Sequence, residues 1–402
     1  MAHHLLLISG VAATHRKAKA LGLRLTLFKA ADRVKVQKHL DMYDRIVGLP
    51  QGASLEEWIE MARAIHRLDP VDAIGGFSET AQEKAALIAE ALNLPFYAPA
   101  VIRRTRNKAE MRAILRAAGL DSTPSQVVAA ADEIVAFGAD HGYPLILKPL
   151  DGLGSLAVAI VRSPDTVAGA FAQVFQRAGG AEILVEGFLE GPEYSVEAFS
   201  EHGRHRVICV TQKFKDPRTC IETGHCVPAP ISDRQRAAIE CFVMDVLEAM
   251  EMTHGPSHTE VVVTADGPKI VETHARLGGD NIVDLIKLTG EVDLEELWIR
   301  QSSGESVFDQ LPAALQGYAA IAYATPQAIG VLERIDGLEA ARGQPGVIRV
   351  EPLQDPGTMI EGAYDSYSRG ASAIAVGDSY EEAVSRAQTA VSQLRFIVTC
   401  AG

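Results

Sequence analysis

The chain has 402 residues, 47% of them hydrophobic and 22% charged, a composition typical of a globular protein with more than one domain. Its net charge of −14 argues against nucleic acid or an anionic membrane as the main partner, because both attract basic surfaces. We find no apolar run of membrane-spanning length, and five cysteines without a CxxC pair favour reduced thiols, so we expect a cytoplasmic protein.

Strands and helices alternate along the first hundred residues. Short apolar runs at residues 5–9, 23–28, 44–49 and 71–77 are typical of buried strands, and we interpret the first as a strand rather than a signal peptide. The helical pattern of residues 78–94 follows the last of them. Strands that alternate with helices predict a parallel sheet with Rossmann-like winding, and the absence of a GxGxxG motif argues against a dinucleotide site there.

A helix is predicted to begin next to Lys108. Asn107 can cap it, with Glu110 three residues later, and Met111 and Leu115 lie on its apolar stripe. Lys108 would then lie in the first turn, where the helix dipole disfavours a cation by roughly 0.3–1 kcal/mol. Either Lys108 is a solvated surface lysine, or an anion lies nearby and outweighs this penalty.

Lys148 ends an apolar strand pattern, and the glycine-rich stretch DGLGS follows it. A second apolar run, residues 156–161, comes after this loop, so the pattern differs from a P-loop, in which a helix follows the glycines. Gly152 and Gly154 can free backbone N–H groups to wrap phosphate oxygens. The alternative is an ordinary hairpin turn.

The stretch from Ile183 to Glu197 combines an apolar turn with acidic residues. A predicted strand ends at Glu186, Phe188 and Leu189 form the turn, and Glu193 precedes a second strand. Such a turn can offer backbone groups to a purine edge, and a nearby carboxylate can accept hydrogen bonds from ribose hydroxyls. Surface acids around a turn would give the same pattern.

The stretch from His258 to Arg276 predicts a β-hairpin around Asp266-Gly267. A three-residue loop of residues 265–267 would place Glu260 directly opposite Glu272, with His274 and Arg276 continuing the same face. Facing like charges repel, so two such carboxylates are better explained by a bound cation, and Mg²⁺ shared with nucleotide phosphates is the natural candidate. A two-residue loop would place the acids on opposite faces, and an exposed polar hairpin is the remaining alternative.

Taken together and in this order, the motifs resemble those of the ATP-grasp superfamily of carboxylate–amine ligases over residues 1–300. They are NKAEMRAILRAAGL, LILKPLDGLGS, VEGFLEGPEYSVE, GPSHTEVVV and VETHARLGGDNI. The HTE and ETHARLGGD forms are most similar to the L-amino-acid ligases that make dipeptides, and the C-terminal stretch from Ser366 looks like the end region of biotin-carboxylase-like members. The resemblance implies an α/β protein with the ATP-grasp fold. Its expected parts are an N-terminal Rossmann-like domain (1–99), a two-lobed ATP-grasp domain (100–300) with a small flap lobe at about 121–187, and a C-terminal α+β region (301–402).

The resemblance also assigns roles to residues of the motifs. The implied ATP-binding residues are Lys108, Lys148, Gly152, Gly154, Ser155, Glu186 at the adenine edge, Phe188 and Leu189 in the hinge, and Glu193 at the ribose. The implied metal ligands, for Mg²⁺ or alternatively Mn²⁺, are Glu260, Glu272 and His274. Many members have asparagine where this chain has His274, and imidazole suits Mg²⁺ less well than oxygen, so His274 is also a candidate to contact substrate. Arg276 would neutralise the acyl phosphate and, with Lys148, act in catalysis.

The implied reaction joins a carboxylate, expected to be an amino acid, to an amine through an acyl phosphate, with release of ADP and phosphate. The segment 213–226 is a candidate lid, where Glu222 and His225, together with Gly278 and Gly279, would contact substrate; a solvated loop is the alternative. The rival activities are a biotin-carboxylase-like carboxylase and a phosphotransferase or non-catalytic nucleotide-binding protein. The expected partners are small molecules, with neither nucleic acid nor membrane, and similar proteins commonly form homodimers.

Overall fold

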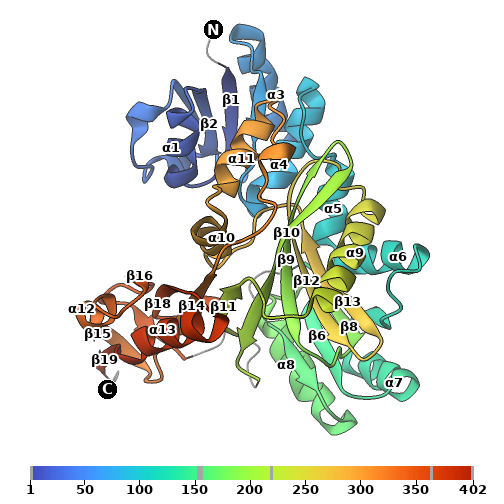
Figure 1. Ribbon diagram of the computed structural model, residues 1–402. Helices are drawn as coiled ribbons and strands as arrows, with labels where there is room; N and C mark the ends of the chain where they lie inside the picture. Colours follow the sequence, from blue (N-terminus) through green and yellow to red (C-terminus); the bar gives the residue numbers. More distant parts are fainter. Residues whose placement is uncertain (1–2, 152–156, 218–220, 363–364, 400–402) are drawn as a thin grey trace.

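The N-terminal part is a parallel sheet flanked by helices (Figure 1). The computed structural model describes residues 3–151, 157–217, 221–362 and 365–399. The four strands pair in the order β3-β2-β1-β4, all parallel, which confirms the Rossmann-like winding. The elements are β1 (His4–Ile8), α1 (Ala12–Ala20), β2 (Arg24–Ala30), α2 (Ala31–Val34), η1 (Leu40–Met42), β3 (Arg45–Leu49), α3 (Leu55–Leu68), β4 (Ala73–Gly75) and α4 (Glu79–Leu92).

Helices α5 (Pro99–Arg106) and α6 (Lys108–Ala117) lead into a small antiparallel sheet. Asn107 caps α6 as predicted, because its side chain accepts a hydrogen bond of 3.0 Å from the backbone N–H of Glu110. The sheet has the order β5-β8-β6-β7, and α7 and α8 lie beside it (Figure 1). Its apolar side chains pack against these two helices. Its elements are β5 (Ser125–Val128), α7 (Ala131–His141), β6 (Leu145–Pro149), β7 (Ala159–Val161), η2 (Pro164–Thr166), α8 (Val167–Arg177) and β8 (Ile183–Gly187).

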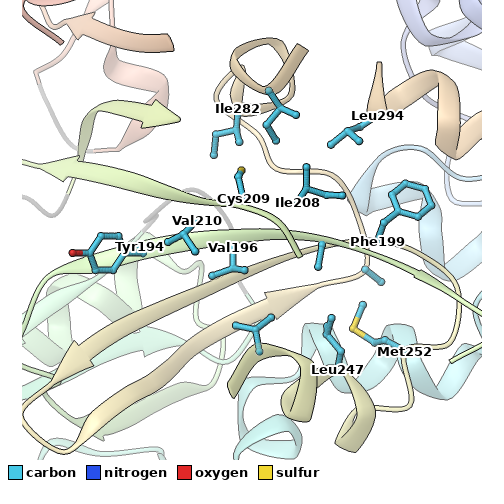
Figure 2. Close-up of a cluster of buried hydrophobic side chains, with 14 of the residues drawn as sticks. Tyr194, Val196, Phe199, Ile208, Cys209, Val210, Leu247, Met252, Ile282 and Leu294 are labelled. Carbon is cyan, nitrogen blue, oxygen red and sulfur yellow. The ribbon is translucent and has the colours of Figure 1, made fainter. Parts of the chain in front are cut away.

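The largest sheet has eight strands in the order β13-β12-β9-β10-β11-β14-β18-β16. Apolar side chains pack on both of its faces, with Leu247 of α9 on one side and Ile282 of α10 on the other (Figure 2). Its strands are β9 (Glu193–Glu201), β10 (Arg204–Lys215), β11 (Glu222–Val227), β12 (Gly255–Thr264), β13 (Gly267–His274), β14 (Tyr318–Ala324), β16 (Val347–Pro352) and β18 (Ala371–Gly377). The helices between them are α9 (Asp233–Ala249), α10 (Ile282–Gly290), α11 (Leu294–Ser302) and η3 (Phe308–Gln310).

The C-terminal strands extend this same sheet, because β14 pairs antiparallel with β11. A separate three-stranded sheet, β17-β15-β19, lies at the C-terminal end of the molecule (Figure 1). The sheet thus continues across residue 300, where a domain boundary was expected, and the three-domain division stays a prediction. The remaining elements are β15 (Gly330–Asp336), α12 (Leu338–Arg342), β17 (Met359–Ile360), η4 (Ser366–Ser368), α13 (Tyr380–Ser392) and β19 (Arg395–Thr399).

Among the described residues, no helix has both the length and the apolar character needed to cross a membrane.

Candidate active site

Two cavities adjoin on one side of the large sheet. The larger has a volume of about 440 Å³ and lies between the small sheet and the β12–β13 hairpin, and the smaller has a volume of about 300 Å³. Three side chains line both cavities: Lys213, Glu260 and Glu272. The predicted site residues that line the larger cavity are Lys108, Lys148, Glu186, Phe188, Leu189 and Glu193. Those that line the smaller one are Glu222, His225, His274, Arg276 and Gly279.

The β12–β13 hairpin brings Glu260 opposite Glu272, although its turn differs from the expected one. Thr264 pairs with Gly267, so the loop has two residues, and the expected three-residue loop is wrong. A two-residue loop alone would separate the acids. A β-bulge next to Glu260 shifts the register by one residue and restores the Glu260–Glu272 pair.

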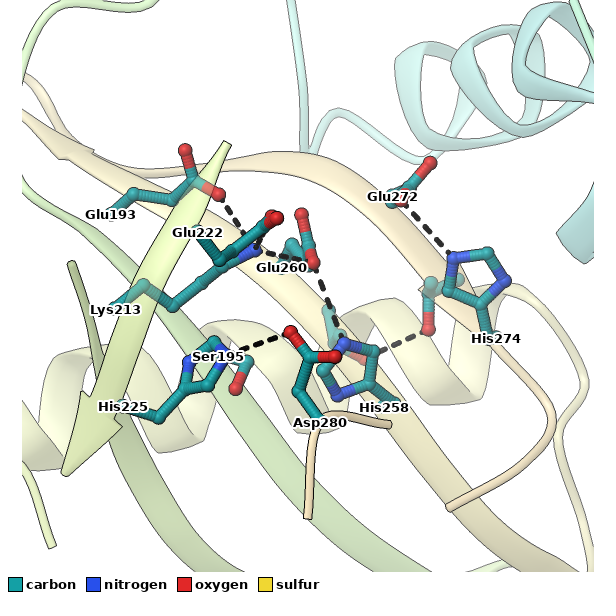
Figure 3. Close-up of polar contacts among 12 residues, drawn as sticks. Glu193, Ser195, Lys213, Glu222, His225, His258, Glu260, Glu272, His274 and Asp280 are labelled. Atoms are coloured by element: carbon teal, nitrogen blue, oxygen red, sulfur yellow. Dashed lines mark hydrogen bonds and ion pairs between the residues drawn. The ribbon is translucent and has the colours of Figure 1, made fainter. Parts of the chain in front are cut away.

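Lysine side chains neutralise both carboxylates, and Figure 3 shows Lys213 beside Glu260. The Lys213 ammonium lies 2.5 Å from Glu260, and the Lys108 ammonium lies 3.0 Å from Glu272. Burial would raise the pKa values of both acids, but Lys213 and His258 hold the pKa of Glu260 well below its usual range, and Lys108 and His274 do the same for Glu272. Lys108 is therefore buried and paired with an anion, and its interpretation as a solvated surface lysine is wrong.

Two imidazoles flank the facing carboxylates in a similar way (Figure 3). His258 lies 2.7 Å from Glu197 through Nδ1 and 3.4 Å from Glu260 through Nε2. His274 lies 3.0 Å from Glu79 and 3.3 Å from Glu272. Burial lowers the pKa of His258, but the two carboxylates outweigh it and raise that pKa to about 9. His258 was missed as a site residue, although its place two residues before Glu260 puts it on the same strand face.

Lys148 forms an ion pair with Glu186 at 2.7 Å, and both side chains are buried. Arg112 contacts the same carboxylate through two bonds of 2.7 and 3.0 Å. Burial would raise the pKa of Glu186, but Lys148 and Arg112 hold it at about 2. Arg112 was also missed; its position beside Met111 on the buried face of α6 was the available signal.

The turn after β8 contributes Phe188 and Leu189 to the wall of the larger cavity. Glu193 accepts hydrogen bonds from Lys215 at 2.6 Å and lies 2.9 Å from the Lys213 ammonium. The predicted flap residues Gly152, Gly154 and Ser155 lie outside the described residues.

Arg276 lies two residues beyond the end of β13, and its Nε donates a hydrogen bond of 2.5 Å to Glu79. Asp280, four residues further along the chain, pairs with Arg369 at 2.6 Å and with His225 at 3.1 Å. Gly278 packs against Glu197 so closely that an added Cβ would lie 2.7 Å from its carboxylate.

The candidate lid is mostly two paired strands. Residues 213–215 end β10, residues 222–226 lie in β11, and the two strands pair antiparallel within the large sheet. Both Glu222 and His225 are buried, so the alternative of a solvated loop is wrong. Ser366, from the C-terminal region, donates a hydrogen bond of 2.8 Å to Glu222.

Three family comparisons match successive parts of the chain. Residues 15–96 match the ATP-grasp N-terminal domain, residues 141–284 the ATP-grasp domain, and residues 322–399 the L-amino acid ligase C-terminal domain 2. The chain is an ATP-grasp protein. The crystal structure of an L-amino acid ligase from Bacillus licheniformis superposes with a TM-score of 0.85 and 25% identity, and the match covers 99% of both chains.

This ATP-grasp protein also has curated relatives of similar sequence. An uncharacterized protein of Sinorhizobium fredii is 29% identical over 76% of this chain and 64% of its own length. An alanine–anticapsin ligase of Bacillus subtilis is 25% identical over 60% of this chain and 56% of its own length. The chain therefore spans less than two thirds of the length of these relatives.

The facing carboxylates of this ATP-grasp protein suit a hard divalent cation. Carboxylate oxygens are the ligands that Mg²⁺ prefers, and Mg²⁺ is usually held by one or two of them together with nucleotide phosphates. Within the described residues, no three His, Cys, Asp or Glu side chains form a group that could hold a metal on their own. Both ring nitrogens of His274 lie near carboxylates, so its imidazole suits a supporting position better than a metal ligand. Two acids and external phosphates fit together as the donor set.

Proposed function

We propose that this protein is an ATP-dependent ligase that joins a carboxylate to an amine through an acyl phosphate. The observation that carries the proposal is the pair of adjoining cavities whose common wall is Lys213, Glu260 and Glu272. One cavity has the lysines and the apolar turn that suit a nucleotide, and the other is lined by charged groups that suit small zwitterions. Phosphoryl transfer requires the two ligands to come within reacting distance, and two cavities that meet at the same side chains allow this.

In this proposal, Lys108 and Lys148 bind the ATP phosphates. Both ammonium groups are already positioned by carboxylates, Lys108 by Glu272 and Lys148 by Glu186, so they are held in place before ATP arrives. Glu193 accepts hydrogen bonds from the ribose. Glu260 and Glu272 would hold Mg²⁺, which when bound neutralises the charge that develops on the phosphate oxygens.

The acid substrate lies in the smaller cavity, next to the shared wall. One of its carboxylate oxygens attacks the γ-phosphorus in line, the bond to the β-phosphate oxygen breaks, and ADP leaves. The neutral amine then attacks the acyl carbon, inorganic phosphate leaves, and the amine loses a proton. Arg276 stabilises the negative charge on the former carbonyl oxygen, with its guanidinium held by Glu79. The similarity to the alanine–anticapsin ligase and the L-amino acid ligase supports pairs of amino acids as the proposed substrates.

The test is ADP and phosphate release over pairs of amino acids, with mass spectrometry of the products. An amide supports the ligase, a carboxylated product a carboxylase, and a phosphorylated product a phosphotransferase. Arg276→Ala should lower kcat on the order of 10²–10³-fold while ADP affinity is kept. Arg300→Ala is the matched control, since Arg300 has similar exposure and a comparable ion pair with Glu305 but lines neither cavity. Normal turnover in Arg276→Ala would contradict the proposed role.

A further inference from the structure

The smaller cavity is lined mainly by charged and hydrogen-bonding side chains. Among the described residues that line it, Ile282 is the single aliphatic side chain. Small-molecule sites are usually mostly apolar with a few polar groups, so this lining is unusual. A large aliphatic or aromatic group placed here would take water away from charged side chains and return no hydrogen bonds to them, which disfavours such a ligand.

One wall of this cavity comes from residues 365–369, which we call the wall segment. Asp365 fixes its shape by accepting hydrogen bonds from the backbone N–H groups of Tyr367 (2.9 Å) and Ser368 (3.0 Å). Ser366 reaches Glu222 on β11, and Arg369 Nε donates a hydrogen bond of 2.6 Å back to the Ser366 carbonyl. The wall segment is therefore held by its own bonds and by a residue of the large sheet.

Arg369 is the part of the wall segment that is fixed most firmly. Its two terminal nitrogens donate to the two carboxylate oxygens of Asp280 at 2.7 and 2.6 Å, a paired geometry that restricts the guanidinium plane. The guanidinium carbon lies 3.9 Å from the ring centre of Tyr323, and the Tyr323 hydroxyl donates to the Asp280 carbonyl. These bonds use three of the five N–H donors of the guanidinium, and the residue is 8% exposed.

We propose that Arg369 determines specificity at the smaller cavity, and that the cavity selects small polar or charged amino acids over aliphatic and aromatic ones. The inference rests on the proposed function only in assigning the acid and amine to this cavity. A fixed, buried guanidinium offers its remaining donors to polar ligand groups, and its charge disfavours an apolar side chain that would remove its hydration.

The test measures amino-acid binding by calorimetry in the presence of ADP and Mg²⁺, so it does not depend on turnover. The ligands are serine, asparagine and glutamate against leucine and phenylalanine. The wild type should bind the tightest polar ligand about tenfold or more tighter than either apolar one, and Arg369→Met should lose most of that preference. ADP affinity should stay the same, because Arg369 does not line the larger cavity.

Arg349→Met is the matched control. Arg349 also joins the C-terminal region to α10, through Asp284 at 2.7 Å, but it lines neither cavity. The same loss of preference in both variants would show that Arg369 acts by holding the two regions together, and would overturn the proposal. So would a wild type that binds leucine or phenylalanine as tightly as the polar ligands, or that binds none of the five.

Arg369→Lys covers the case in which Arg369→Met does not fold. It keeps the charge but cannot form the paired contact with Asp280, so it should lose part of the preference; wild-type selectivity in this variant would overturn the proposal. Selective binding without ADP release for any pair would contradict the proposed ligase activity and leave the specificity of the cavity standing.

Discussion

Three buried lysines in the site, Lys108, Lys148 and Lys213, each contact carboxylates of the protein. A buried ammonium is costly unless it is paired, and here the pairing exists before any ligand is bound. Burial still lowers the pKa of Lys148, and the nearby cations Arg112 and Lys108 add to this, so Glu186 offsets only part of the shift. An added phosphate would favour the charged form of Lys148 further.

Replacement of Lys148 by methionine should weaken ATP binding by roughly 1.5–3 kcal/mol, because a charge-assisted phosphate contact is lost. The fold should persist, since Arg112 still neutralises Glu186. Isothermal titration calorimetry with ATP measures the change. Lys38→Met is the control, because Lys38 is exposed and does not line the larger cavity, and equal ATP affinity in the two variants would contradict the role of Lys148.

Glu272→Gln should abolish Mg²⁺-dependent ADP release. From the sequence alone, two facing acids repel, and neutralising one would not destabilise the protein. The structure reverses that expectation, because Glu272 neutralises the buried Lys108, and its loss should lower the free energy of unfolding by on the order of 1–3 kcal/mol. Urea unfolding and Mg²⁺ titrations measure the two effects.

Glu90→Gln, on an exposed position of α4, is the control for both measurements. Full activity of Glu272→Gln, or activity of the wild type in EDTA, would exclude the metal site.

Single residues differ in how well the sequence predicted their surroundings. Lys108, Lys148, Glu260 and Glu272 stand out in motifs, and the structure brings all four to the walls of the cavities. Arg112 stands out less, because its partner Glu186 is 74 residues away in sequence and only the tertiary fold brings the two together.

At the scale of elements, local patterns predicted where helices begin more reliably than how strands pair. Asn107 caps α6 through a contact three residues away, which the sequence shows directly. The β12–β13 register depends on a bulge, and the residue pattern near Glu260 did not predict it. The facing acids were therefore predicted from a turn that the structure does not have.

Asn107→Ala should lower the free energy of unfolding by about 1 kcal/mol, because the helix N-terminus loses its cap. Since Lys108 is the first residue of α6, fraying there should also weaken ATP binding. Ser54→Ala removes a comparable cap from α3, whose residues line neither cavity, and should lower stability without changing ATP affinity. If Asn107→Ala and Ser54→Ala lose the same stability and bind ATP equally well, the result would contradict a role for Lys108 in nucleotide binding.

At the scale of the molecule, Arg112 joins three parts of the structure. It lies on α6, contacts Glu186 of the small sheet, and donates a bond of 2.8 Å to Asp121. Asp121 in turn accepts a hydrogen bond from the backbone N–H of Ile270 in the large sheet. The two walls of the larger cavity are thus connected through one buried guanidinium.

Arg112→Met should cost about 3–5 kcal/mol of unfolding free energy, because two buried carboxylates lose a shared cation. Chemical denaturation followed by circular dichroism measures it. Arg334→Met removes an exposed pair with Asp336 and should cost less than about 1 kcal/mol. A loss in Arg112→Met as small as in this control would mean that the connection between the sheets contributes little.

The origin of the two cavity linings has a consequence for how such proteins diverge. The described residues that line the larger cavity all lie between Lys108 and Glu272, whereas the smaller cavity draws residues from Glu79 to Arg369. Mutations that accumulate after Glu272 can therefore remodel the smaller cavity while the lining of the larger one is inherited unchanged. The product of a duplicated gene can in this way acquire specificity for a new pair of substrates while it keeps the proposed nucleotide site.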